Sequence, residues 1–382
     1  MDRNAARESV LPLLEQLVAI PTWEGNTEAN ALRFLQDWLQ RYGIRSELRE
    51  QGGDVLALVS RLGSEAAAPL IFNSHVDTVP PAELDRWESD PYTLTRAGEN
   101  VVGLGAADAK GSVAAMVCAY VALHEVWPDD AALELMIVGA EERGGLGTRL
   151  VAAGGLSGAA IVGEPTSLVP CVACKGVVRT RIVCHGKAAH ASSPELGINA
   201  LYPIGALLLE LEALGYEVAA RHEKWTGKAS LAVTLIEGGT AHNVIPAACA
   251  IHVDRRLVPG ERADEAIAQI EERIAAVKAR YPRARFERVT YRTIEPVSID
   301  PEEPIVAACR AAAPERGLSG FTACCDLSHI VELGGIPGVV WGPGPLSAAH
   351  QVNEALPVAE LEAAVGAYYD AALAWARRSV AH

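Results

Sequence analysis

The sequence lacks the features that mark a nucleic-acid-binding or membrane protein. Positive charge is in deficit, because 33 Lys and Arg residues stand against 48 Asp and Glu residues and give a formal net charge of −15. Such a chain would repel a phosphate backbone, so we expect it to bind neither nucleic acid nor an anionic membrane surface. Eighteen consecutive apolar residues occur nowhere, and the first twenty residues contain no uninterrupted apolar run. The sequence therefore predicts neither a transmembrane span nor a signal peptide.

Cysteine patterns typical of a structural metal site are missing as well. Cys171 and Cys174 form a CxxC pair, but no second pair follows at zinc-ribbon spacing. The chain has 382 residues, of which 50% are hydrophobic, so it can bury a large core without disulfides. We therefore expect reduced thiols and a cytoplasmic enzyme. The length predicts two or three domains.

Short apolar runs alternate with helical periodicity in the first and last parts of the chain, which predicts an α/β fold with a largely parallel sheet. The strands expected there are 55–59, 70–73, 133–138, 159–162 and 338–341, and the expected helices are 5–20, 27–42, 111–126, 303–313 and 358–378.

The pattern changes at residue 177 to the order β-α-β-β-α-β, which describes a ferredoxin-like α+β unit. Its expected strands are 177–185, 229–236, 248–256 and 286–291, and its expected helices are 198–214 and 263–280. We expect a catalytic domain built from residues 1–176 and 294–382, with residues 177–293 inserted into it as a second domain.

Residues that can bind metal recur where the predicted strands of the outer domain end. His75 and Asp77 close one strand, the pair Glu141-Glu142 follows another, and Glu164 follows a third. Asp108 and His350 come after further glycine-bearing turns. Each member alone has an ordinary explanation, such as a helix N-cap for Asp108. The set is a strong signal, because open α/β sheets assemble their sites at the carboxyl ends of strands.

Imidazole and carboxylate ligands without thiolates suit Zn²⁺, or Co²⁺ or Mn²⁺. Five such side chains are too many for one tetrahedral ion, whereas two ions that share a bridging carboxylate need about this number. The sequence therefore predicts two divalent metal ions. One acid of the Glu141-Glu142 pair is then left to act as a general base for hydrolysis, and Asp77 can hold the far ring nitrogen of His75.

At this point the sequence resembles the co-catalytic dizinc amidohydrolases, a family that includes acetylornithine deacetylase, succinyl-diaminopimelate desuccinylase, aminoacylase and the glutamate carboxypeptidases. The resemblance covers nearly the whole chain. Seven blocks match in order: His75–Val79, Gly105–Gly111, Glu141-Glu142, Gly163–Thr166, Gly186–Pro194, Gly238–Pro246 and His350–Glu354.

The resemblance implies a zinc-peptidase-like α/β/α catalytic domain and an inserted dimerisation or lid domain. It makes His75, Asp108 and Glu164 the ligands of one metal and Asp108, Glu142 and His350 those of the other. Glu141 would be the general base and Asp77 would orient His75. The remaining implied roles belong to residues of the inserted domain: His190 reaching the site of a neighbouring subunit in a homodimer, and Asn243 and Arg256 contacting a substrate carboxylate.

The expected reaction is hydrolysis of the amide of an N-acyl amino acid. A dipeptidase or carboxypeptidase acting on short peptides is the alternative, and a non-catalytic binding relative is a remote one, since the set of ligands and base is complete. Two departures from the family pattern argue against close identification with one enzyme. Leu104 stands where relatives commonly carry Arg, and Ala109 where many carry Met.

Overall fold

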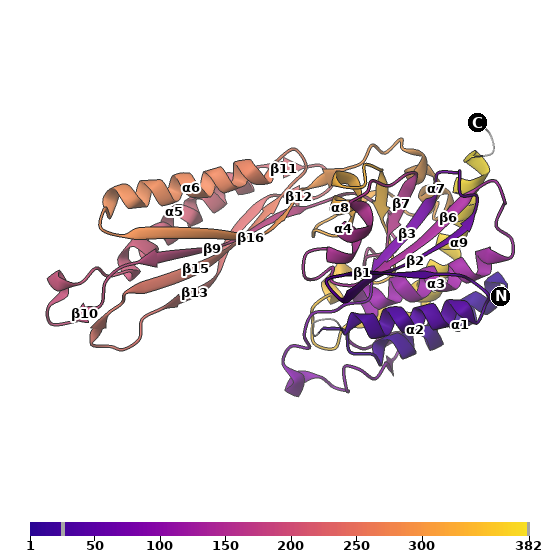
Figure 1. The fold of residues 1–382 in the computed structure, drawn as a ribbon, viewed down its shortest axis with the longest axis horizontal. Helices are drawn as coiled ribbons and strands as arrows, with labels where there is room; N and C mark the ends of the chain where they lie inside the picture. The colour runs from indigo at the N-terminus through magenta and orange to yellow at the C-terminus, as the bar shows by residue number, and fades with distance from the viewer. Residues whose placement is uncertain (24–26, 380–382) are drawn as a thin grey trace. The chain divides into compact units, whose positions relative to one another are not determined.

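The structure is a computed structural model that describes residues 1–23 and 27–379, and these residues form two compact units. Unit 1 contains Met1–Ala173, Ser298–Phe321 and the chain from Cys325 onward, and unit 2 contains Cys174–Val297 with Thr322–Cys324 (Figure 1). The domain limits expected at residues 177 and 293 stay a prediction, because compactness alone does not establish an independently folding domain.

Unit 1 is built on a nine-stranded sheet with the order β1-β2-β6-β3-β7-β19-β8-β17, to which β18 is added beside β8. Strands β6, β3, β7 and β19 pair with their neighbours in this group in parallel, whereas β2 pairs antiparallel with β6 and β8 pairs antiparallel with β19. The strands of the sheet are β1 (Glu47–Gln51), β2 (Asp54–Gly63), β3 (Leu70–His75), β6 (Ala132–Val138), β7 (Ala159–Val162), β8 (Cys171–Cys174), β17 (Val297–Ser298), β18 (Ser319–Phe321) and β19 (Gly338–Val340).

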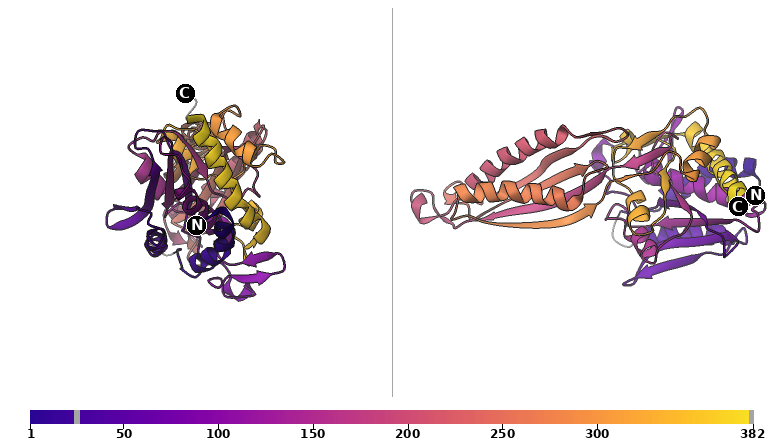
Figure 2. Two further views of the ribbon diagram at one scale, coloured as in Figure 1. Left: turned by 90° about the vertical axis from the view of Figure 1, so that its right-hand side faces the viewer. Right: turned by 90° about the horizontal axis from the view of Figure 1, so that it is seen from above.

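Helices cover both faces of this sheet, as the alternation along β3 demonstrates. Ser74 and Phe72 face α3 and α9, and Asn73 between them faces α4. The helices of unit 1 are α1 (Arg3–Val18), α2 (Glu28–Gln40), α3 (Gly111–His124), α4 (Leu146–Ala152), α7 (Pro304–Ala312), α8 (Leu327–Glu332) and α9 (Val358–Ser379). Figure 2 shows α1 and α9 side by side.

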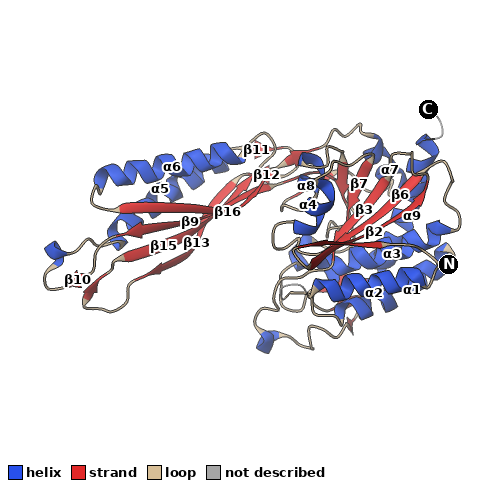
Figure 3. Cartoon of the chain, viewed as in Figure 1, coloured by secondary structure: helices blue, strands red, loops and turns tan. Residues whose placement is uncertain are grey.

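Unit 2 contains the antiparallel sheet β13-β15-β9-β16, with α5 (Leu201–Ala219) and α6 (Ala263–Arg280) packed on one face (Figure 3). Its strands are β9 (Gly176–His185), β13 (Ser230–Gly238), β15 (Ala248–Leu257) and β16 (Arg285–Ile294). The order in the chain is β-α-β-β-α-β, as expected. Two small antiparallel pairs are β10 (Ala189–His190) with β14 (Val244–Ile245) and β11 (His222–Glu223) with β12 (Gly227–Lys228). In unit 1 a three-stranded antiparallel sheet has the order β20-β5-β4, formed by β4 (Thr95–Ala97), β5 (Asn100–Val102) and β20 (Ala355–Pro357).

The mixed α/β class is confirmed, but the expectation of a largely parallel sheet is wrong outside its centre. The tight turn at Gly52 and Gly53 joins β1 and β2 as a hairpin, which forces antiparallel pairing at that edge. The segment Ala106–His124 is long and apolar enough by composition to cross a membrane. Every residue from Ala106 to Leu123 is buried within unit 1, as is typical of a core helix, and α3 contacts β3 and β6.

Candidate metal centre and active site

The parallel centre of the sheet brings the expected metal-binding residues to one edge. His75 is the last residue of β3, while Glu141 and Glu164 follow the ends of β6 and β7. Because β6, β3, β7 and β19 are adjacent and parallel, the loops after these strands meet at the same edge. Asp108 lies three residues before the start of α3, in a turn where its φ of −124° and ψ of 89° depart from helical values, and Lys110 is the N-cap residue of α3. Asp108 is therefore not the helix N-cap that its sequence position allowed.

Two groups of donor atoms share Asp108. One contains His75, Asp108 and Glu164, the other contains Asp108, Glu142 and His350, and within each group the donor atoms lie within 4.8 Å of one another. Oδ1 of Asp108 lies 3.1 Å from His75 Nε2, and Oδ2 lies 3.3 Å from His350 Nε2. The carboxylate thus turns one oxygen to each imidazole, which is the arrangement needed to bridge two ions.

The donor set fits divalent cations of the zinc type, because it offers only imidazole nitrogen and carboxylate oxygen. Nε2 of His75 is directed into the site because Nδ1 is bonded elsewhere, 2.9 Å from the main-chain oxygen of Asp77. Nε2 of His350 lies 2.6 Å from Glu142 Oε1. His75 is fully buried and His350 is about half exposed, so the two groups differ in their access to solvent.

The charges in the site also favour a cation. Burial raises the pKa of Glu164 well above its usual value, and the charge of Asp108 raises it further. Burial alone would raise the pKa of Asp108, but the hydrogen bond and charge of His75 hold it below its usual value. The hydrogen bond to Glu142 raises the pKa of His350 to about 8. Crowded carboxylates that repel one another gain stability from a bound divalent ion.

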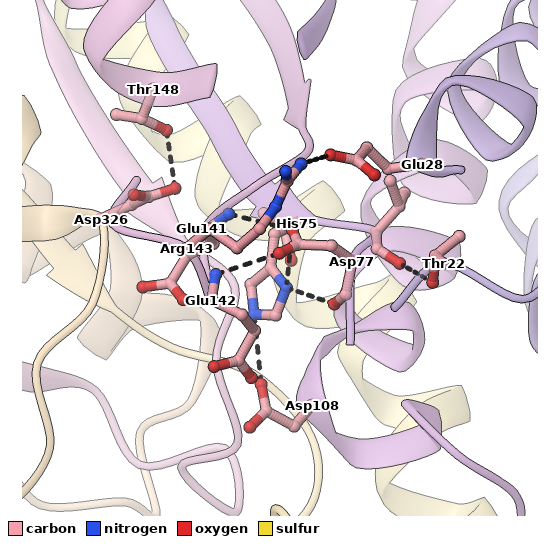
Figure 4. Close-up of polar contacts among 12 residues, drawn as sticks. Thr22, Glu28, His75, Asp77, Asp108, Glu141, Glu142, Arg143, Thr148 and Asp326 are labelled. Carbon is pink, nitrogen blue, oxygen red and sulfur yellow. Dashed lines mark hydrogen bonds and ion pairs between the residues drawn. The ribbon is translucent and has the colours of Figure 1, made fainter. Parts of the chain in front are cut away.

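Asp77 contacts His75 through its main chain. Its carboxylate was expected to hold the imidazole of His75, but Oδ1 lies 3.6 Å from Nδ1, beyond hydrogen-bond distance. The main-chain carbonyl of Asp77 orients the imidazole instead. The two carboxylate oxygens accept the backbone N–H groups of Glu141 and Glu142, each at 3.0 Å, as Figure 4 shows. Asp77 therefore fixes both His75 and the turn that carries the two glutamates.

Glu141 is buried and belongs to neither donor group among the described residues. Burial raises its pKa well above the usual value, and the charge of Asp326 raises it further. A carboxyl group with a raised pKa is suited to take up a proton near neutral pH. Two residues after Glu141, Arg143 pairs with the buried carboxylate of Glu28 and anchors the turn from the other side (Figure 4).

Sequence reasoning missed a buried polar chain behind Glu141. Thr148 donates its hydroxyl hydrogen to Asp326 Oδ2 at 2.7 Å and accepts the side-chain N–H of Asn73 at 3.1 Å. All three residues are almost fully buried. The only signal in the sequence is a single acid, Asp326, just before an apolar helical segment, and such an acid is usually a cap.

The other expected site residues lie in unit 2. His190 is exposed on β10, with Nδ1 2.7 Å from Ser192 Oγ, and the carbonyl of Asn243 accepts the N–H of Ala191 beside it. Arg256 lies near the far end of β15, where it contacts Asp254 at 2.6 Å. The strand places Ala248 at the end near His190. The eight steps along the strand from Ala248 to Arg256 span about 27 Å at the usual rise per residue, so Arg256 lies far from His190 within unit 2.

Comparison with known proteins agrees with this fold and donor set, which define a metal-dependent hydrolase acting on amides. Residues 71–374 match the model of Peptidase family M20/M25/M40, and the chain belongs to this family. An acetylornithine deacetylase of Proteus mirabilis is 30% identical over 376 residues, which cover 94% of this chain and 95% of that protein. A probable carboxypeptidase of Aspergillus clavatus is 30% identical over 383 residues, which cover 94% of this chain and 81% of that protein.

Solved structures of low sequence identity share the fold. The metallo-carboxypeptidase Sso-CP2 of Sulfolobus solfataricus, described as an M20 family member, has a TM-score of 0.80 at 16% identity, over 96% of this chain and 99% of that one. The YXEP protein of Bacillus subtilis, described as a dinuclear metal-binding peptidase, has a TM-score of 0.71 at 17% identity, over 97% of this chain and 98% of that one.

The shared position of Asp108 leads to a prediction about metal content. Asp108→Asn keeps one carbonyl oxygen, but its amide NH₂ cannot ligate, so the side chain cannot bridge two ions. We expect the variant to retain at most one metal equivalent after dialysis, measured by elemental analysis. Asp326→Asn is the matched control, since Asp326 is also a buried aspartate and belongs to neither donor group of the described residues.

The control should retain as much metal as the wild type. Chelation should abolish hydrolysis, and Zn²⁺ or Co²⁺ should restore it. Two equivalents of metal in Asp108→Asn, or full activity after exhaustive chelation, would refute a shared dinuclear centre.

Proposed function

We propose that the protein hydrolyses the amide bond of an N-acyl amino acid with two divalent metal ions, Zn²⁺ or alternatively Co²⁺ or Mn²⁺. The observation that carries the proposal is the carboxylate of Asp108, which turns its two oxygens to two different histidines. The ions would be held by His75, Asp108 and Glu164 and by Asp108, Glu142 and His350. When bound, such ions polarise a carbonyl and lower the pKa of water.

Glu141 is the proposed general base. It takes a proton from the water that attacks the amide carbon, and it delivers that proton to the nitrogen as the carbon–nitrogen bond breaks. The products are a carboxylic acid and an amino acid with a free amine. The position of Glu141 supports this role, because Asp77 holds its backbone N–H while its own carboxylate is left out of both donor groups of the described residues.

A free carboxylate on the substrate is supported by the charges around Arg256. Arg256 and Arg179 both bind the single carboxylate of Asp254, at 2.6 and 2.8 Å. Burial lowers the pKa of the nearby Lys175, and the positive charge of Arg256 lowers it further. Two arginines thus share one acid while Lys175 lies near Arg256, and a substrate carboxylate would balance this excess of positive charge. Asn243 lies beside His190, so the second proposed contact is Asn243 of the partner subunit in the dimer proposed below.

The proposed assembly is a homodimer located in the cytoplasm. Strand β13 is an edge of the sheet of unit 2, with Leu235 and Ile236 more than half exposed, and α5 exposes Leu209 and Tyr216. An apolar edge strand of this kind is suited to pairing with a second copy. The distance between His190 and Arg256 in one chain is too long for both to contact one small substrate. We therefore propose that His190 acts on the site of the partner subunit, where it donates a hydrogen bond to the oxyanion.

A peptidase acting on short peptides is the second candidate. The carboxypeptidase among the relatives and the peptidase among the solved structures favour it. Both reactions use the same base and the same grip on a free carboxylate. Assays of the purified protein against N-acetyl, N-succinyl and N-formyl amino acids beside dipeptides separate the two, since a deacylase hydrolyses the first three classes faster.

The two adjacent glutamates should respond differently to substitution. If Glu141 moves protons and does not bind metal, Glu141→Ala keeps normal metal content while kcat falls by roughly 10²–10⁴-fold or more. Glu142→Ala should lose a metal equivalent, because Glu142 belongs to a donor group. Elemental analysis and steady-state kinetics of both variants measure this, and metal loss only in Glu141→Ala would show that the roles are reversed.

The proposed carboxylate grip predicts discrimination against neutral substrates. Amidated or esterified versions of a good substrate should have a much lower kcat/KM than the free acid. Arg256→Ala should reduce this difference in kcat/KM, because it should lower kcat/KM for the acid only. Arg181→Ala is the control, since Arg181 lies on the same sheet in a weak, exposed ion pair with Glu237. This variant should keep the wild-type difference in kcat/KM between acid and amide. Equal hydrolysis of acid and amide by the wild type would contradict the grip.

A mixed dimer tests the action of His190 across subunits. One subunit carries Glu141→Ala and the other carries His190→Ala. If His190 acts on the partner's site, one site combines both defects and the other is intact, so activity should return to about half the wild-type level per mixed dimer. A histidine acting in its own chain leaves both sites defective. Mass tagging of one partner verifies subunit exchange, and exchange without recovery of activity would exclude the trans role.

A further inference from the structure

We propose that Glu354 is a positioning residue for the metal centre, because its carboxylate binds the backbone of the turn that presents Asp108. Oε1 accepts the N–H groups of Ala107 and Asp108 at 2.7 and 2.9 Å, and Oε2 accepts the N–H of Gly105 at 2.8 Å. The side chain is 2% exposed. The inference rests on the proposed bridging role of Asp108. It adds Glu354, which is neither a proposed ligand nor the proposed base.

The turn has a local need for such an acceptor. Asp108 and Ala109 leave the helical region, so the backbone just before α3 cannot form a continuous helical hydrogen-bond ladder. Glycine at position 105 has φ +77°, and a Cβ there would lie 2.6 Å from Thr78 Cγ2. The chain is therefore turned and tightly packed at the point where it must present the bridging carboxylate. A carboxylate can accept hydrogen bonds from several amides at once, since it carries only acceptors.

The same glutamate connects this turn to the loop of a second metal ligand. Glu354 follows His350 by four residues, and its main-chain oxygen accepts the N–H of Gly103 at 3.0 Å. Directly after it, β20 pairs with β5, with Ala355 opposite Val102. One short segment thus carries His350 and clamps the turn of Asp108, which fixes the 3.3 Å separation between His350 Nε2 and Asp108 Oδ2.

Glu354→Gln tests the proposal, because the glutamine NH₂ group would face an amide N–H and only one oxygen would remain. Residues that support metal ligands change metal affinity by roughly 10–100-fold when substituted. We expect a loss of that size in Glu354→Gln, measured by titrating metal-free protein with Zn²⁺, together with an altered absorption spectrum of the Co²⁺-loaded protein. The kcat should fall while KM changes little, since Glu354 lies outside the proposed substrate contacts.

Glu223→Gln is the matched control. Glu223 Oε2 accepts the backbone N–H groups of Trp225 and Thr226 and the hydroxyl hydrogen of Thr226 at 2.7–2.9 Å, but Glu223 is a residue of unit 2 and belongs to neither donor group of the described residues. This variant should keep wild-type metal affinity and the wild-type Co²⁺ spectrum. Thermal unfolding of the metal-free proteins reports any general loss of stability, which a purely structural role would produce without a spectral change.

Glu354→Asp keeps the acceptors on a shorter side chain and should restore part of the metal affinity and of the spectrum. If Glu354→Gln does not fold, Glu354→Asp alone tests the positioning role. Wild-type metal affinity in Glu354→Asp would then overturn the proposal. A folded Glu354→Gln with wild-type affinity, spectrum and kcat would overturn it as well. Metal loss in Asp108→Asn without metal loss in Glu354→Gln would remove only this inference, whereas full metal content in Asp108→Asn would remove the bridging role itself.

Discussion

Carboxylates gathered away from water around one imidazole are the constraint on which the rest of unit 1 depends. Asp77, Asp108, Glu141 and Glu164 are each at most 9% exposed, and each charge raises the free energy of its neighbours. The fold offsets this cost with donors of fixed direction. Backbone amides bind Asp77, and the imidazole of His75 binds Asp108. Divalent ions would supply the remaining positive charge.

The position of the site follows from the same constraint. Four adjacent parallel strands deliver their loops to one edge, where side chains can converge while their backbones remain in the sheet. The buried strands supply rigidity, since β3 and β7 are buried along their whole length. Rigid support matters here because a bridging carboxylate tolerates little displacement. The antiparallel strands at the sheet edges add width without contributing a proposed ligand.

Much of this could be predicted from the sequence, because each part carries a local signal. Helical periodicity and apolar runs located α6, β7 and the β-α-β-β-α-β order, and the recurrence of His, Asp and Glu at strand ends located the donor groups. Contacts made through the backbone carry no such signal. The carbonyl of Asp77 holding His75 and the carboxylate of Glu354 holding three amides depend on the path of the main chain. The pairing direction of the outer strands likewise depends on turn geometry.

The two units divide the proposed tasks in a way that matches their burial. The proposed ligands and base lie in unit 1, and all but Glu142 and His350 are buried among fixed partners, so substitutions there act first on metal binding and proton transfer. The proposed substrate contacts of unit 2 are partly or fully exposed, and Arg256 shares Asp254 with Arg179. Exposed side chains can change with little effect on a core. On the proposed assignment, substitutions at exposed residues of unit 2 would therefore change substrate preference while the chemistry of unit 1 stays the same.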